Sequence, residues 1–183
     1  MAIKAKTIEG FEPSNFSHSF FLDSNVWMYL IFPQHSTIAE KHIKNYSSLF
    51  EKIKKKDCII FTDIIQISEL VNLILRIEYK KYLKANSCRI EFKEFRMLDA
   101  GKKALMSAKT LIQIITKSAT ISSGVFSSEE LKVMANDCDK ADFNDVFFAN
   151  FCQKKKAILV THDFDFNALK VDLEVLSANE NYL

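Results

Sequence analysis

The sequence predicts a single α/β domain with a three-layer fold, in which a central parallel sheet is flanked by helices. Short, nearly continuous apolar runs at residues 18–22, 58–61 and 157–161 are typical of strands that are buried on both faces. Longer segments between them carry apolar residues at helical spacing, and alternating strands and helices indicate a parallel sheet. With 183 residues, 48% of them hydrophobic, the chain is long enough for one core and too short for two comfortable domains.

The first third of the chain contains an expected arm, a strand and two helices. Residues 1–17 show little periodicity, so we expect an N-terminal arm followed by one domain over residues 18–183. The first strand ends at Asp23, where the chain turns into a short helix through Leu30. Apolar residues at three-to-four spacing, with lysines on the opposite side, then predict a surface helix over residues 37–56.

The middle third contains a second buried strand and a long helical region. After the strand at 58–61, Thr62 or Asp63 supplies an N-cap for a helix over residues 64–84. Because this helix is apolar almost all round, its one polar stripe indicates that an edge of it faces something polar. The stripe consists of Gln66, Glu69, Asn72 and Arg76. Residues 86–127 are expected to add extra helical material as one or two basic helices.

The last third begins with a helix signal. Ser127 and Glu130 match a capping box, which starts a helix through about Asp137. A second helix over residues 142–154 precedes the third buried strand, and residues 171–176 predict a last strand at the edge of the sheet.

Charge is distributed unevenly along the chain, although the net charge is only +2. Residues 76–117 hold eleven basic and four acidic side chains, whereas residues 118–183 hold six basic and eleven acidic ones. A basic surface beside an acidic metal pocket suits chemistry on a phosphate backbone, because lysines and arginines attract the polyanion. A solvated helical face explains the basic region equally well.

Other patterns exclude several classes of protein. The four cysteines and four histidines lack the paired spacing of a zinc site, so we expect reduced core thiols and assign no histidine to a metal. The longest apolar runs are far too short to span a bilayer. We therefore expect a cytoplasmic protein that has no membrane partner.

Four carboxylates lie just beyond an apolar run, or within two helical turns of one. They are Asp23, Glu69, Asp145 and Asp163. Ligands of open parallel sheets bind beyond the carboxyl ends of the strands, where we expect these four side chains to converge. Each pair of carboxylates ~5 Å apart costs roughly 3 kcal/mol at an effective dielectric of ~20, so the group requires a counter-ion.

A divalent cation is the natural counter-ion for such a group, because hard cations prefer oxygen ligands. A bound Mg²⁺ or Mn²⁺ can activate a water molecule and stabilise the leaving oxygen of a phosphodiester. The residues therefore predict metal-dependent hydrolysis of phosphodiester bonds.

Four segments that contain these acids resemble, in order and spacing, the successive motifs of the PIN-domain nucleases. Within that family the chain is most similar to the VapC-type toxin ribonucleases of bacteria and archaea. The segments are Phe21-Leu22-Asp23-Ser24-Asn25-Val26, Ser68-Glu69-Leu70, Asn144-Asp145-Val146 and Leu159-Val160-Thr161-His162-Asp163-Phe164-Asp165-Phe166. The chain departs from the small toxins in its leading 17 residues and in the extra material at 86–127.

Position by position, the resemblance makes Asp23, Glu69, Asp145 and Asp163 both the catalytic and the metal-binding acids. It makes Asn25 and Thr161 their polar neighbours. It further implies a PIN-like three-layer fold, dependence on Mg²⁺ or Mn²⁺, and endonucleolytic cleavage of RNA. For a toxin it also implies an antitoxin protein as partner and a homodimer.

Each acid also has a structural interpretation. Asp23 is placed to cap the next helix, and Glu69 could be a solvent-facing side chain on an otherwise buried helix. Asp142 is placed to cap the helix that contains Asp145, and capping alone would account for it. We keep it as a reserve acid. Asp165 is the second reserve, because Asp163 is nearer the strand.

The residues and the resemblance together predict an enzyme, a metal-dependent endoribonuclease, and the resemblance to VapC-type proteins further implies the toxin of a toxin–antitoxin pair. Two alternatives stay open: a structure-specific DNA nuclease, and a catalytically inactive PIN module that binds RNA or a partner protein. A phosphotransferase with an aspartate nucleophile is less favoured, because Asn25 stands where that class usually has a second aspartate.

Overall fold

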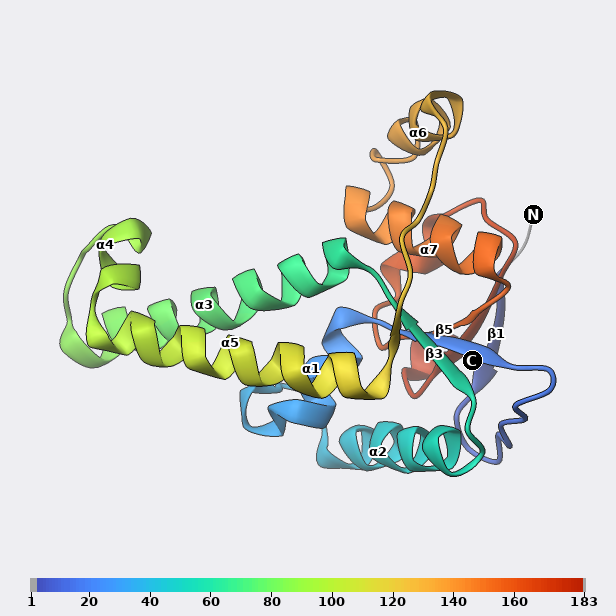
Figure 1. The fold of residues 1–183 in the computed structure, drawn as a ribbon, viewed down its shortest axis with the longest axis horizontal. Helices are drawn as coiled ribbons and strands as arrows, with labels where there is room; N and C mark the ends of the chain where they lie inside the picture. Colours follow the sequence, from blue (N-terminus) through green and yellow to red (C-terminus); the bar gives the residue numbers. More distant parts are fainter. Residues whose placement is uncertain (1–2, 183) are drawn as a thin grey trace.

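The structure, a computed structural model, describes residues 3–182 and contains one six-stranded parallel sheet within them (Figure 1). The strand order is β1-β6-β5-β2-β3-β4, and every pair of neighbours is parallel. The strands are β1 (Ile3–Thr7), β2 (Ser19–Leu22), β3 (Ile59–Thr62), β4 (Thr120–Ile121), β5 (Ile158–Val160) and β6 (Leu173–Ser177). The helices are α1 (Ser24–Ile31), α2 (Glu40–Lys55), α3 (Ile64–Asn86), α4 (Phe92–Met97), α5 (Asp99–Ser118), α6 (Ser128–Ala135) and α7 (Phe143–Lys155).

Helices cover both faces of the sheet, which confirms the predicted three-layer α/β fold. Alternation along β2 sends Phe20 and Leu22 to one face and Phe21 to the other. The first face packs against α1, α2, α3 and α5, and the second packs against α6 and α7. Because both faces are covered, the central strands are apolar throughout, as the continuous runs in the sequence indicate.

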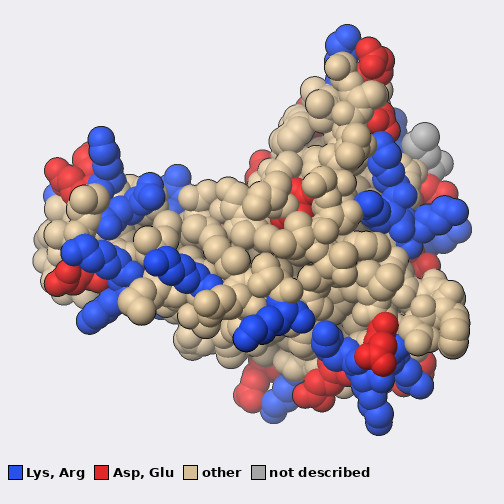
Figure 2. All heavy atoms as spheres, viewed as in Figure 1, with Lys and Arg blue, Asp and Glu red and all other residues tan. Residues whose placement is uncertain are grey.

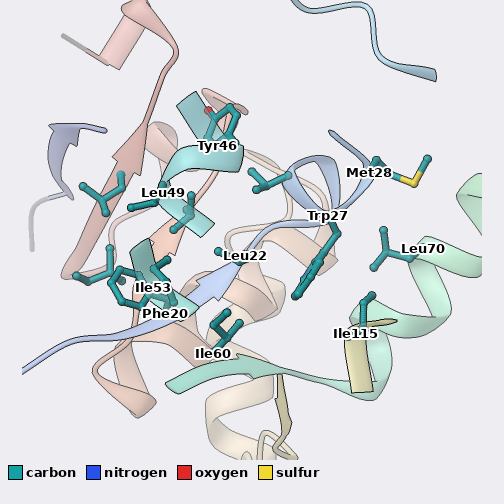
Figure 3. Close-up of a cluster of buried hydrophobic side chains, with 14 of the residues drawn as sticks. Phe20, Leu22, Trp27, Met28, Tyr46, Leu49, Ile53, Ile60, Leu70 and Ile115 are labelled. Carbon is teal, nitrogen blue, oxygen red and sulfur yellow. The ribbon is translucent and has the colours of Figure 1, made fainter. Parts of the chain in front are cut away.

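The larger core fills the first face, and Figure 3 shows how its side chains meet. Trp27 of α1 and Tyr46 of α2 are at most 1% exposed, as are Phe20 and Leu22 from β2. Burying aromatic and branched side chains of this size stabilises the fold by about 1.5–3 kcal/mol each. This core fixes where β2 ends, and therefore where Asp23 lies.

Helices α3 and α5 pack side by side and extend well beyond the sheet, with α4 across their tip (Figure 1). We call residues 75–108 the helical arm. It has a small core of its own, formed by Leu75, Phe95 and Ala104. Gly101 allows α5 to approach α4 closely, because a Cβ atom there would lie 2.2 Å from the Phe95 carbonyl oxygen. Of the extra helical material expected over residues 86–127, residues 86–108 belong to this arm, and the rest comprises the end of α5, strand β4 and a loop.

Two expectations about the ends of the chain were wrong. Residues 3–7 belong to the domain, because they form β1 and pair in parallel with residues 173–177. They carry the alternation Ile3-Lys4-Ala5-Lys6, which is the pattern of an edge strand. Because β1 occupies the edge, β6 lies inside the sheet between β1 and β5 and is not the edge strand we expected.

Two of the predicted helix caps are confirmed, whereas another, Asp142 before α7, makes no capping hydrogen bond with its side chain. Of the two candidate caps for α3, Asp63 is the one used, since its Oδ1 accepts a hydrogen bond from the Ile65 amide at 2.8 Å. Ser127 and Glu130 form the predicted capping box of α6. None of the helices within residues 3–182 is both long and apolar enough to cross a membrane.

Candidate acidic site

Asp23 lies at the carboxyl end of β2, where that strand passes into α1, and its side chain is 5% exposed. Oδ1 accepts a hydrogen bond from the Ser24 amide at 2.6 Å, so the carboxylate does cap the helix. Oδ2 accepts a second bond, at 2.6 Å, from the hydroxyl of Thr161, which follows the neighbouring strand β5. Capping and site formation are therefore compatible roles of one buried carboxylate.

The segment after β5 joins Asp163 to Asp23 through Thr161. The Thr161 hydroxyl oxygen accepts a hydrogen bond from the Asp163 amide at 2.9 Å. The Asn25 amide nitrogen lies 3.5 Å from the same hydroxyl oxygen, and Asn25 Oδ1 accepts from the His162 amide at 3.4 Å. Strands β2 and β5 are neighbours, which is why their following residues can meet.

Glu69 and Asp145 reach the same edge from two helices. Glu69 lies in the second turn of α3, and Asp145 lies in the first turn of α7. The two helices are linked directly, since the Asn144 amide donates a hydrogen bond of 3.2 Å to Glu69 Oε2. Both carboxylates are half-buried, so Glu69 is not simply a solvent-facing residue.

The carboxylates act on one another electrostatically. The pKa of Asp23 is raised to about 7, mainly by burial and also by the negative charges of Glu69 and Asp163, while the hydrogen bonds from Thr161 and Ser24 oppose the increase. Burial likewise raises the pKa of Asp145 to about 7, with added repulsion from Asp23 and Asp163. Perturbed carboxylates of this kind gather at functional sites more often than elsewhere.

Glu69 belongs to the same coupled group. Its pKa is raised, first by burial and then by the charge of Asp145, while the hydrogen bond from Asn144 opposes the increase. The four acids predicted from the sequence therefore come together from four separate segments of the chain. In Figure 2, acidic atoms lie in the hollow between the helical arm and the projection formed by α6 and α7.

The two reserve acids lie at the margin of the group. Asp142 occupies the N-cap position of α7 but makes no capping hydrogen bond with its side chain, so capping does not explain it. Asp165 is exposed, and its backbone amide donates to Asp163 Oδ1 at 3.0 Å. Both charges still raise the pKa of Asp145, which places Asp145 at the electrostatic centre.

The donor atoms suit a hard divalent cation, because all of them are oxygens. Within residues 3–182, no three acidic, histidine or cysteine side chains are arranged closely enough to hold one ion, so the acids form a coupled group and not a formed coordination sphere. Within the described part of the chain, the buried Ser24 hydroxyl has no hydrogen-bond partner of good geometry, although it lies close enough to Glu69 to lower the pKa of that carboxyl. An unpartnered buried hydroxyl beside two carboxylates fits a site completed by an ion with its waters.

Sequence reasoning missed the residues that hold this edge in place. The Tyr46 hydroxyl, from α2, donates to the Thr161 carbonyl at 2.9 Å, lies 3.0 Å from His162 Nδ1 and accepts from the Ala178 amide at 3.1 Å. Tyr182 OH donates to the Asp163 carbonyl at 2.6 Å. Asn144 directly precedes Asp145 in the sequence and could have been found from that position, whereas nothing in the periodicity of α2 distinguishes Tyr46 from an ordinary core residue.

Comparisons with known proteins do not assign a family. No family model matches the chain, and no curated protein matches it. Among solved structures, that of PAE2754 from Pyrobaculum aerophilum is similar over 88% of this chain and 86% of that chain, at 14% sequence identity and a TM-score of 0.47. Similarity at this level carries no functional argument, so the interpretation of the site rests on its own chemistry.

Proposed function

We propose that this protein is a Mg²⁺- or Mn²⁺-dependent endoribonuclease that hydrolyses RNA phosphodiester bonds at the acidic site. The observation that carries the proposal is the convergence of Asp23, Glu69, Asp145 and Asp163 at the carboxyl edge of a parallel sheet, where burial, and then mutual repulsion, raise the pKa of three of them. Several buried carboxylates are expected to lie together where a bound cation offsets their desolvation and mutual repulsion.

The side chains divide the work between binding and positioning. In this proposal the four carboxylates hold the cation, which when bound supplies an activated water and neutralises charge on the phosphate. Thr161 and Ser24 fix the orientation of the Asp23 carboxylate, and Asn144 does the same for Glu69. Because the pKa of both Asp23 and Asp145 is about 7, protons compete with the cation, and binding of the cation releases protons near neutral pH.

RNA is the proposed substrate because a basic region adjoins the acids in the sequence and in space. Residues 76–117, eleven of them Lys or Arg, form the outer part of α3 and nearly all of α4 and α5. Glu69 lies on α3, which therefore carries both an acid of the site and the start of the basic region. A cationic surface of this kind attracts a polyanion and raises its local concentration at the acids.

The resemblance to PIN-domain nucleases and VapC-type toxins gives the proposal its wider context. We propose a cytoplasmic toxin that is a homodimer and is held inactive by a small antitoxin protein. Light scattering of the isolated protein tests the dimer, and a result of monomer alone would contradict it.

The decisive experiment is cleavage of a mixed RNA pool by purified protein in Mn²⁺, in EDTA, and in Mn²⁺ after Asp23→Asn. Asp172→Asn is the matched control, because Asp172 is exposed and precedes β6, at the opposite edge of the sheet. We expect cleavage only by the wild type and the Asp172 variant, and only with metal. Cleavage retained in Asp23→Asn would contradict the mechanism, and preference for labelled DNA over RNA of equal length would contradict the substrate.

A further inference from the structure

One face of α3 links the acidic site to a row of cations. At 3.6 residues per turn, positions 7, 11 and 15 residues after Glu69 lie on the same side of the helix as Glu69. Those positions are Arg76, Lys80 and Lys84, and all three are exposed. We call these three side chains the cationic track. It begins about two turns beyond Glu69 and runs toward the tip of the helical arm.

The track is not neutralised by its neighbours. Within residues 3–182, neither Lys80 nor Lys84 forms an ion pair, and Arg76 lies over the ring of Phe92 at 5.2 Å without an acidic partner. The opposite side of the same helix differs, because Glu78 there pairs with Lys81 at 3.0 Å. A solvated helical face would be expected to spread its charges evenly, so the segregation favours a polyanionic partner.

An exposed aromatic residue lies beside the acidic site. Phe143 is the first residue of α7 and is 43% exposed. The next residue, Asn144, donates to Glu69, so the ring lies close to the acidic end of the α3 face. A cationic groove combined with an aromatic platform is the usual means of binding a single-stranded nucleic acid, because every unstacked base offers a flat face.

We propose that the cationic track binds the backbone of a single-stranded RNA on one side of the cleavage point, with Phe143 stacking on a base near the acids. This inference rests on the proposed ribonuclease function, which it deepens by naming the strandedness and the path of the substrate. With a rise of 1.5 Å per residue, Lys84 lies about 22 Å along α3 from Glu69. At 3.4 Å per stacked nucleotide, that distance corresponds to about six nucleotides on that side.

Binding of a labelled RNA tests the track separately from catalysis. The probe is a fluorescein-labelled, unstructured 20-nucleotide RNA, measured by anisotropy in EDTA so that metal-dependent cleavage is absent. The test variant is Lys80→Ala with Lys84→Ala, and the matched control is Lys54→Ala with Lys55→Ala. The control lysines are also exposed and unpaired within the described residues, but they lie at the end of α2, next to the amino edge of the sheet.

Loss of two phosphate contacts to a single strand has a defined signature. The slope of log Kobs against log[salt] falls in magnitude by about 1.4, and the dissociation constant at 0.1 M salt rises roughly 25-fold. We expect both changes in the track variant and neither in the control. We also expect that shortening the RNA below about six nucleotides on the track side reduces affinity in the wild type and not in the track variant.

Three results would contradict the proposal that the track binds single-stranded RNA. They are unchanged RNA affinity of the Lys80 and Lys84 variant, an equal loss of affinity in the control variant, and equal affinity of the wild type for a duplex of the same sequence. The ribonuclease proposal fails independently of these results. If wild-type protein binds RNA through the track but never cleaves it with Mn²⁺, the track stands and the catalytic proposal falls. If cleavage requires Asp23 while the track variant binds RNA as the wild type does, the catalytic proposal stands and the proposed role of the track is wrong.

Discussion

The two edges of the parallel sheet differ in the charged residues that gather at them and in how deeply those residues are buried. At the amino edge, the runs Lys54–Lys56 and Lys154–Lys156 end α2 and α7 just before β3 and β5. At the carboxyl edge, Asp23 follows β2 and Asp163 follows β5. These lysines lie at helix C-termini, where the helix dipole favours cations, and all but the half-buried Lys155 are exposed. Lys155 lies over the Phe61 ring at 5.8 Å, and Lys154 pairs with Glu130 at 3.0 Å. The acids are partly or fully buried beside one another.

This difference distinguishes charged residues that stabilise helix ends from charged residues that stay close together although they repel one another. The lysine runs end helices, and their charges do not lower the free energy of unfolding. The acids destabilise the fold when they are ionised, because burial and mutual repulsion raise the pKa of Asp23, Glu69 and Asp145. Residues that oppose stability in this way are characteristic of functional sites. Three changes, ordered by expected effect, test the contrast between the edges.

The largest effect is expected for Asp23→Asn on the pH dependence of stability. The pKa of Asp23 is raised to about 7 from 3.8, so between those values the folded state binds more protons than the unfolded state, and stability falls as pH rises. This one group lowers the unfolding free energy of the wild type by roughly 2–3 kcal/mol between pH 5 and pH 8. The variant lacks that loss, as urea unfolding in EDTA at the two pH values would measure.

Asp172→Asn provides the control for that experiment. Its stability is expected to follow the wild type at both pH values, because Asp172 is exposed at the amino edge. A pH profile of Asp23→Asn that is identical to the wild-type profile would show that the carboxyl edge is no more strained than the amino edge.

The next effect is expected for Tyr46→Phe, which removes the hydroxyl that ties α2 to the carboxyl edge. The change leaves the Thr161 carbonyl and the Ala178 amide without this partner, at a cost of about 1–3 kcal/mol. Thermal or urea unfolding measures the loss. Tyr82→Phe is the matched control, since the Tyr82 hydroxyl makes no hydrogen bond within residues 3–182. Equal stability of the two variants would argue that the Tyr46 hydroxyl does not hold the edge together.

The smallest effect is expected at the amino edge. Lys54→Ala with Lys55→Ala removes two cations from the last turn of α2, where the dipole contributes about 0.3–1 kcal/mol for each charge at low salt. We expect a loss of stability of that size, which high salt abolishes, and no change in RNA cleavage. A larger loss that persists in salt would mean that these lysines have a specific structural role.

Much of the carboxyl edge could be predicted from the sequence, because continuous apolar runs identify buried strands and parallel strands gather the residues that follow them. Asp23 and Asp163 therefore fell at one edge by topology alone. Glu69 and Asp145 needed a further fact, the approach of α3 and α7, which depends on packing between distant segments. The Asn144–Glu69 hydrogen bond records that approach and has no local signature.

The missed elements have physical reasons of their own. Strand β1 lies at the edge and has no continuous apolar run, so the signal used for the buried strands does not find it, and pairing with β6 makes it a strand. Without β1, residues 171–176 looked like the edge. Tyr46 lies among core residues of an ordinary amphipathic helix. Its role depends on the positions of the Thr161 carbonyl and the Ala178 amide, which come from distant segments of the chain. Helical periodicity cannot contain that information.

Binding of Mn²⁺ to the isolated protein tests the central claim most directly. Electron paramagnetic resonance titration counts bound Mn²⁺ in the wild type, in each of the variants Asp23→Asn, Glu69→Gln, Asp145→Asn and Asp163→Asn, and in the Asp172→Asn control. We predict that all four site variants bind Mn²⁺ at least about tenfold more weakly, while the control binds as the wild type does. Equal Mn²⁺ affinity in the wild type and all four variants would contradict the claim that these acids form one cation site.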